Sequence, residues 1–254
     1  MRTLRTDTLP DLSGSHGGPA FFSTWRVGSP ERQRRVAEAV AEAWEKREWP
    51  HPGLLSYAVF ANTDGDHLMH QSLWRDQRAH QEFVRLASNG RDERNAEVDR
   101  AAPGIERIGL ARTRHYRGGT FRDGVFTPRT GPQPTPDSGI AVLVKIVFEG
   151  PDEERQRAWT DALIQALATE PEPMTGARSA DFHLGLDGAT VFNYSVWDSE
   201  QAHRDRLAAH GEGIGSPTPA WERTRDFPGH LVESDRLTRN RLAVRLVPEE
   251  PDGR

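Results

Sequence analysis

The pattern of apolar and polar positions divides the chain into two halves that follow the same order of elements. In each half an apolar strand segment precedes a helix with apolar residues three or four positions apart, and two strands, a second helix and a last strand follow. The predicted strands span 21–27, 54–61, 67–74 and 108–116 in the first half, and 140–148, 180–186, 190–197 and 237–246 in the second. The pattern therefore predicts that both halves of the chain have the same order of strands and helices.

The third strand of each half, with the start of the helix after it, is a copy of its counterpart. In Gln71–His80 and Tyr194–His203 the residues Ser, Trp, Ala and His occupy matching places, at 72 and 195, 74 and 197, 79 and 202, and 80 and 203. Asp64-Gly65 and Asp187-Gly188 repeat at the same offset, and Asp-Gly is typical of a tight hairpin turn. Asp76 and Ser199 are matching helix N-caps. Self-similarity in register indicates a tandem repeat of one small domain.

Each half has the order β-α-β-β-α-β, which is the ferredoxin-like split βαβ arrangement. Such a sheet carries helices on one face, and two copies in one chain can bury the other faces against each other. We therefore expect an α+β protein in which two tandem ferredoxin-like domains pack as an intramolecular dimeric α/β barrel. The predicted divisions are a flexible tail (1–18), a first domain (19–118), a linker (119–138), a second domain (139–248) and a tail (249–254).

Composition narrows the function classes. The chain has 254 residues, a net charge of -5 and arginines scattered among acids, which gives no reason to expect nucleic-acid binding. No apolar run approaches the roughly 18 residues that span a bilayer, and the N-terminus lacks a secretory signal pattern, so we expect a cytoplasmic protein. Cysteine is absent, which excludes disulfides, thiolate nucleophiles and Cys-ligated metals.

Candidate chemistry lies on the third strands. Strand alternation places Asn193, Ser195 and Trp197 on one face, and likewise His70, Ser72 and Trp74. A Trp ring offers a flat apolar wall to an aromatic ligand, and an Asn amide can donate to a carbonyl or to the oxyanion formed when a phenol or anthrone loses a proton.

Each candidate also has a structural interpretation. The two Trp residues can be core aromatics, Asn193 can face solvent at a sheet edge, and His70 is either a general base or hydrogen-bond donor or an exposed strand residue. We expect His80 and His203 to make structural hydrogen bonds near the capping turns. His67 and His70 point to opposite strand faces, so no metal site is predicted. The further candidates for substrate binding are Trp25, Tyr57, His183 and Lys145, of which Lys145 is either an anion-stabilising group or an edge residue.

Residues 19–118 and 139–246 each contain a strand that ends in Trp, followed by an N-cap residue and a helix with an Ala-His pair. With this repeated motif the sequence resembles the antibiotic biosynthesis monooxygenase superfamily in a tandem two-domain form. In the polyketide-tailoring members, single-domain dimers oxidise anthrones to quinones without a metal or flavin prosthetic group. They place an Asn and a Trp four residues apart on one strand, and Asn193 and Trp197 match that pair. The first copy departs from the pattern, because His70 stands in the place of Asn before Trp74.

The resemblance implies a monooxygenase that inserts oxygen from O₂ into a polycyclic aromatic polyketide during antibiotic biosynthesis, by quinone formation or oxidative ring opening. Asn193, Trp197 and His70 would be catalytic, and Trp74, Ser72 and Ser195 would contact the substrate. Alternatives on the same fold are a non-oxidative polyketide cyclase and a non-catalytic ligand-binding or stress protein.

No dinucleotide-type glycine loop follows a strand, so we expect no tightly bound cofactor. O₂ would be the co-substrate, and reduced flavin (FADH₂ or FMNH₂) from a partner flavin reductase is compatible with the sequence. A monomer or a homodimer is expected, because the internal repeat removes the usual need for a partner chain.

Overall fold

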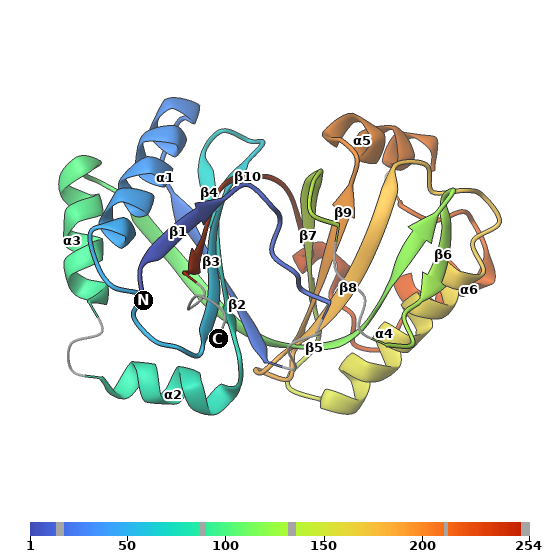
Figure 1. Cartoon of the computed structure of the whole chain (residues 1–254). Coiled ribbons are helices and arrows are strands. Elements are labelled where there is room, and N and C mark those ends of the chain that lie inside the picture. Colours follow the sequence, from blue (N-terminus) through green and yellow to red (C-terminus); the bar gives the residue numbers. More distant parts are fainter. Residues whose placement is uncertain (14–17, 87–89, 132–135, 211–212, 250–254) are drawn as a thin grey trace. The chain divides into compact units, whose positions relative to one another are not determined.

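The computed structural model describes residues 1–13, 18–86, 90–131, 136–210 and 213–249 (Figure 1). The chain forms two compact units, which the following paragraphs take one at a time. None of the described helices combines the length and the apolar character that a membrane span requires.

Unit 1 is a sheet covered by helices on one face (Figure 1). Its strands follow the order β1-β10-β3-β4-β2-β5, and its helices are α1, α2 and α3. The bounds are β1 (Thr3–Thr6), β2 (Pro19–Arg26), α1 (Pro30–Glu45), β3 (Leu54–Asn62), β4 (His67–Trp74), α2 (Gln77–Arg85), α3 (Arg91–Ala101), β5 (Glu106–Arg122) and β10 (Arg236–Pro248). β5 belongs to unit 1 up to Arg112, and β10 belongs to it from Asn240 onward.

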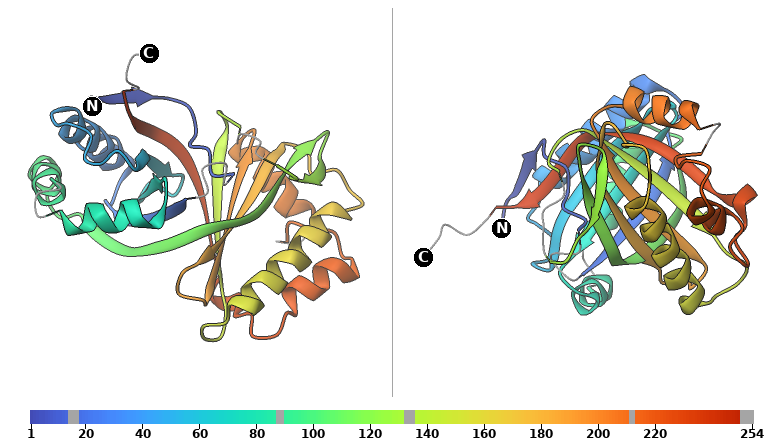
Figure 2. Two further views of the ribbon diagram at one scale, coloured as in Figure 1. Left: turned by 60° about the horizontal axis from the view of Figure 1, so that its bottom comes forward. Right: turned by 90° about the vertical axis from the view of Figure 1, so that its right-hand side faces the viewer.

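Unit 2 repeats the arrangement with the strand order β5-β8-β9-β7-β10. Its helices are α4, α5 and α6, of which α4 and α6 lie side by side (Figure 2). The bounds are β6 (Val125–Pro128), β7 (Ile140–Val147), α4 (Glu153–Ala168), β8 (Ala177–Gly185), β9 (Thr190–Trp197), α5 (Glu200–Ala209), α6 (Pro219–Arg225) and the 3₁₀ turn η1 (Val232–Ser234). The remainder of β5 and the start of β10 complete this unit.

The four strands of each copy keep the ferredoxin-like order, since β3-β4-β2-β5 and β8-β9-β7-β10 are the same sequence of neighbours. The predicted α+β class and the β-α-β-β-α-β order are therefore confirmed. The two last strands are longer than predicted. Beyond its own copy, β5 pairs with β8 from Thr113 onward, and β10 pairs with β3 from Asn240 onward.

Local sequence explains where the helices begin. Ser29, Asp76, Asp152 and Ser199 are extended N-cap residues whose side chains accept a backbone N–H three residues on. Such a cap satisfies a donor that the first turn leaves unpaired, and it contributes about 1 kcal/mol. The caps at Asp76 and Ser199 confirm the prediction from the repeat.

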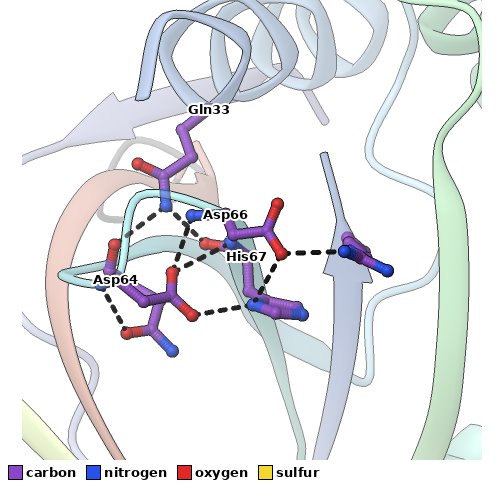
Figure 3. Close-up of polar contacts among 6 residues, drawn as sticks. Gln33, Asp64, Asp66 and His67 are labelled. Carbon is purple, nitrogen blue, oxygen red and sulfur yellow. Dashed lines mark hydrogen bonds and ion pairs between the residues drawn. The ribbon is translucent and has the colours of Figure 1, made fainter. Parts of the chain in front are cut away.

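The Asp64-Gly65 turn is fixed by a polar network (Figure 3). Asp64 Oδ1 accepts the backbone N–H groups of Asp66 and His67 at 2.7 and 3.1 Å, and its other oxygen contacts His67 Nδ1 at 2.7 Å. From α1, Gln33 Nε2 donates to the carbonyls of Asn62 and His67 at 2.8 and 2.7 Å. The amide thereby ties both strands of the hairpin to the helix.

Unit 2 contains the same device. Gln156 of α4 is fully buried, and its Nε2 donates to the carbonyls of Gly185 and Thr190 at 3.1 and 2.6 Å. Asp187 Oδ1 accepts the backbone N–H of Thr190 at 3.0 Å. Gly188 has φ +72°, a conformation that glycine adopts without strain. The hairpin that carries Asn193 and Trp197 is therefore anchored at its turn.

Two parts of the chain differ from the prediction. Within the predicted flexible tail, Thr3–Thr6 forms β1 against β10, and Leu9 and Leu12 are buried. Within the predicted linker, β5 continues to Arg122 and forms a hairpin with β6. Short polar segments of this kind become strands because a neighbouring strand edge supplies hydrogen bonds, which the local pattern does not reveal. Residues 14–17, 132–135 and 250–254 of the predicted tails and linker lie outside the described residues.

Candidate active site

Unit 2 contains a cavity of about 230 Å³ between its sheet and its helices. Apolar cavities of about 150 Å³ accept benzene, and drug-sized ligands occupy about 300–1,000 Å³, so this space suits a ligand of a few fused rings. Most of its wall is apolar. The wall includes Phe121, Val142, Val144, Ile146, Trp159, Leu163, Leu167, Met174, Ala180, Trp197, Leu207, Trp221 and Leu237, and the polar lining residues are Asn193, Ser195, His203, Thr224, Arg225, His230 and Asp235.

Asn193, Ser195 and Trp197 all line this cavity, in agreement with the alternation along β9. Trp197 is buried, and its indole N–H donates to Ser195 Oγ at 3.2 Å. The Ser195 hydroxyl in turn donates to the carbonyl of Val142 at 3.4 Å. Ser195 therefore holds the indole plane in place.

The first copy has the same pair. The indole N–H of Trp74 donates to Ser72 Oγ at 3.1 Å, and Trp74 is buried. In both copies the Ser of the Ser-x-Trp motif thus fixes the orientation of the Trp ring, which explains why the two residues recur together.

Asn193 has a free hydrogen-bonding atom in the cavity wall. It lies opposite Val144 and Phe182 in the sheet, and its Oδ1 is buried without a hydrogen-bond partner among the described residues. A buried amide oxygen without a partner costs free energy, about 1–3 kcal/mol for a group of this kind. A ligand hydroxyl or a water molecule bound in the cavity would satisfy it.

His203 of α5 closes the cavity beside Trp197. The two rings meet edge to face, with centroids 4.9 Å apart, and His203 is buried. Arg239 Nε donates to His203 Nδ1 at 3.0 Å. Burial lowers the pKa of His203 to about 4, and the charges of Arg239 and Arg204 act in the same direction. His203 is therefore a neutral imidazole whose proton is on Nε2.

His230 and Asp235 form a closed pair in the wall. His230 Nε2 contacts Asp235 Oδ2 at 2.9 Å, and Nδ1 contacts the Thr224 carbonyl at 3.2 Å. Burial opposes the charged form, but the hydrogen bond and charge of Asp235 outweigh it and raise the pKa of His230. Asp235 Oδ1 accepts the backbone N–H of Val147 at 3.1 Å. The pair therefore links the segment of residues 230–235 to β7. Both imidazole nitrogens of His230 are engaged, so neither is left to act as a base.

The buried carboxylate of Glu170 holds the 213–216 segment and α6 beside the cavity. Glu170 Oε2 accepts the indole N–H of Trp221 at 2.6 Å, and Ser216 donates to Glu170 through its backbone N–H at 3.1 Å and through its hydroxyl. Arg206 of α5 approaches Glu170 at 3.0 Å, and its Nε donates to the Ile214 carbonyl at 2.9 Å. Glu170 therefore connects α5, the 213–216 segment and α6.

Unit 1 has larger side chains where the cavity lies in unit 2. Sheet register equates Tyr57 with Ala180, Trp25 with Ile146 and His70 with Asn193. The Tyr57 hydroxyl and His70 Nδ1 are 2.8 Å apart, and the Trp25 ring lies 3.9 Å from the His70 ring.

Burial lowers the pKa of His70 to about 3, and the charge of Arg107 adds to the effect. These three residues contact one another and replace the open wall of unit 2 with packed rings. His70 is therefore neutral and sits inside an aromatic cluster, whereas Asn193 borders open space.

Two further sequence candidates lie away from the cavity. Lys145 is exposed, because it alternates with the cavity residues Val144 and Ile146 along β7. His183 is buried on the other sheet face, where its ring lies 5.3 Å from that of His115, and burial holds its pKa well below the usual value. The structure does not bring either residue to Asn193.

Sequence reasoning missed several residues of the site. His203 was expected to hold the capping turn, but the Ser199 side chain performs that role and the His203 ring contacts Arg239 instead. Glu170, Trp221 and the His230–Asp235 pair carried no recognisable motif. Among the described residues no group of three or more His, Cys, Asp or Glu side chains is arranged to bind a metal ion.

Comparison with known proteins finds a partial sequence match and several solved structures with a similar fold. It is 39% identical over 71 residues to the tetracenomycin-F1 monooxygenase of Streptomyces glaucescens, in a match that covers 28% of this chain and 60% of that protein. No family model matches the chain. An anthrone oxidase-like protein of known structure is 18% identical with a TM-score of 0.63, over 92% of this chain and 94% of its own.

The partial sequence match to a monooxygenase agrees with the superfamily that the duplicated motif resembles, and the solved structures share the fold. A candidate monooxygenase from Lactobacillus acidophilus shares the fold with 11% identity and a TM-score of 0.52, over 91% of this chain and 96% of its own. At these identities the solved structures establish the fold, and the chemistry has to be argued from the cavity.

Proposed function

We propose that the chain is a monooxygenase that inserts oxygen from O₂ into a polycyclic aromatic polyketide. The observation that carries this proposal is the cavity of unit 2, in which a fixed indole wall stands beside an unpartnered amide oxygen in otherwise apolar surroundings. The similarity to tetracenomycin-F1 monooxygenase supports the same class of reaction. A flat ligand of a few fused rings matches the cavity in size and polarity.

Quinone formation balances without an external reductant. The methylene group of an anthrone loses a proton to solvent, and the resulting carbanion reacts with O₂ and takes up a proton, which gives a hydroperoxide at that carbon. One oxygen atom stays as the new carbonyl, and the other leaves as water with the two hydrogens of the methylene group. Oxidative ring opening would instead require two electrons, which reduced flavin from a partner reductase would supply.

The lining residues provide hydrogen-bond donors and shape, and the imidazole nitrogens that could act as bases are engaged. His203 Nδ1 accepts from Arg239, and both nitrogens of His230 have partners. The substrate would therefore ionise because its anion is stabilised by hydrogen bonds from the Asn193 amide NH₂ and from His203 Nε2–H in an apolar site. Trp197 and the other apolar walls would orient the rings and exclude water.

The test is O₂ uptake by the purified chain with a simple anthrone, with and without reduced flavin, and mass analysis of the product made under ¹⁸O₂. We expect one labelled oxygen atom in the product. Label in the product only when reduced flavin is added would assign the flavin-assisted route. Product without label, or turnover without O₂ uptake, would identify a cyclase, and binding without turnover would identify a ligand-binding protein.

Asn193→Ala is the decisive variant. Loss of one preorganised donor to a developing oxyanion typically reduces kcat about 10²- to 10³-fold, and we expect a reduction of that order. His70→Ala alters the matching position of unit 1 and serves as the comparison. Because His70 is packed between Trp25 and Tyr57, we expect its loss to lower stability and to leave kcat per folded molecule within about threefold. Equal losses in both variants would contradict the assignment of the site to unit 2.

A further inference from the structure

The contact between Arg239 and His203 has a direct consequence for what the cavity can recognise. Arg239 lies on β10, two positions after the cavity residue Leu237, so both side chains point to the same face of the sheet. Its guanidinium donates through Nε to His203 Nδ1 at 3.0 Å. An arginine keeps its proton at any ordinary pH, so Nδ1 must act as the acceptor.

We propose that Arg239 is a positioning residue that fixes His203 as the Nε2–H tautomer, and that the cavity thereby selects aromatic ligands that carry a carbonyl or phenolate oxygen beside Trp197. This inference rests on the proposed function only in assuming that the substrate occupies the same cavity. It concerns binding, and it holds whether or not oxygen is transferred.

The geometry leaves one ring nitrogen for the ligand. His203 is buried, lines the cavity and meets the Trp197 ring edge to face at 4.9 Å. With Nδ1 engaged by Arg239, Nε2–H is the remaining polar group of the ring. A donor fixed in a dry wall favours a ligand oxygen over a C–H group, because an unpaired buried donor costs about 1–3 kcal/mol.

Asn193 complements this donor. Its amide borders the same cavity with a buried oxygen that lacks a partner among the described residues. An amide oxygen accepts from a ligand hydroxyl, whereas the His203 ring donates to a carbonyl or phenolate oxygen. The two groups together match a fused aromatic system that has both a hydroxyl and a keto or phenolate oxygen on its edges.

Electrostatics around His203 keep it neutral. Burial is the largest cause of its lowered pKa, and the charges of Arg239 on β10 and Arg204 on α5 act in the same direction. Glu200 of α5 pairs with Arg204 at 2.6 Å, which partly offsets that charge. The pKa of Arg239 is itself lowered, mainly by burial, in keeping with its place next to the cavity.

The experiment compares two probes under anaerobic conditions, so that no oxidation occurs. Anthrone carries the carbonyl oxygen, and 9,10-dihydroanthracene has the same ring skeleton without it. Affinity is measured by quenching of tryptophan fluorescence for the natural chain and for His203→Phe, Arg239→Met and Arg204→Gln. ¹⁵N NMR of the histidine side chains reports the tautomer of His203 in each protein.

We expect the natural chain to bind anthrone about tenfold more tightly than dihydroanthracene. That ratio should fall to near one in His203→Phe and by at least threefold in Arg239→Met, with NMR showing the loss of the single Nε2–H tautomer. Arg204→Gln removes a neighbouring charge without touching the ring, so the ratio and the tautomer should stay unchanged.

An unchanged ratio in Arg239→Met, or an Nδ1–H tautomer in the natural chain, would overturn the proposal. If Arg239→Met does not fold, Arg239→Lys and the tautomer of the natural chain decide the question. O₂ uptake is scored separately. If the protein prefers anthrone to dihydroanthracene but takes up no O₂, only the oxygenase proposal is refuted. If it takes up O₂ but binds the two probes equally, only this inference is refuted.

Discussion

Replacement of Glu170 by Gln should destabilise the protein far more than replacement of a surface acid. The Glu170 side chain is 3% exposed, and its partner Arg206 is 7% exposed. Gln keeps the size and one acceptor oxygen, but it leaves the buried guanidinium without its nearest carboxylate. Breaking a buried pair from one side typically costs about 3–5 kcal/mol.

Two neighbouring contacts reduce that cost. Arg206 also approaches Glu172 at 3.6 Å, and the Gln amide oxygen can still accept from Ser216 or Trp221. We therefore expect a loss of about 2–4 kcal/mol in the free energy of unfolding. For a chain of this size that corresponds to a decrease in Tm of about 5–12 °C.

The loss should also depend on pH. Burial alone would raise the pKa of Glu170, but the hydrogen bonds from Ser216, the Glu172 N–H and Trp221 outweigh it and lower the pKa. A carboxylate with a depressed folded-state pKa contributes stability above its unfolded pKa of about 4.3, and this contribution disappears as pH falls through the folded pKa. The difference between Glu170→Gln and the natural chain should thus be full at neutral pH and shrink below about pH 4.

Thermal unfolding followed by near-ultraviolet circular dichroism measures the effect. Glu82→Gln is the matched control, because Glu82 pairs with Arg78 at 2.8 Å on the surface and is 43% exposed. Exposed pairs contribute about 0–1 kcal/mol, so this variant should barely change Tm. Equal decreases in Tm in the two variants would refute the claim that Glu170 holds α5, the 213–216 segment and α6 together.

Two further predictions follow from the repeat. Gln156→Met removes the donor to the Gly185 and Thr190 carbonyls and should cost about 2–3 kcal/mol, and Gln33→Met should cost a similar amount. Urea unfolding measures both, and a cost below about 0.5 kcal/mol in either variant would contradict the anchoring role. Ala180→Tyr introduces into the cavity wall the side chain that unit 1 has at the matching position, Tyr57, and should weaken anthrone binding at least about tenfold. Unchanged affinity in a fluorescence titration would argue against the cavity as the binding site.

Much of the fold could be predicted because its signals are local. The Asp-Gly turns, the caps at Asp76 and Ser199 and the alternation that brings Asn193, Ser195 and Trp197 together all depend on residues a few positions apart. The repeat made each prediction twice, so chance matches were improbable.

The features that escaped prediction depend on distant residues. β1 forms because β10 offers an edge to residues at the other end of the chain, and His203 meets Arg239 across 36 positions of sequence. The difference between the two units is equally non-local. Whether a cavity lies beside the third strand depends on Ala180 or Tyr57 on the neighbouring strand, which neither residue reveals by itself.

Oxygenation of an aromatic substrate in the cavity of unit 2 can be tested directly. The most direct measurement is the uptake of O₂ by the purified chain in the presence of anthrone, with Asn193→Ala run alongside. We predict uptake of one O₂ for each anthrone converted to quinone, and a rate at least about 100-fold lower in the variant. The absence of uptake by the natural chain, both with and without reduced flavin, would contradict the assignment of an oxygenase.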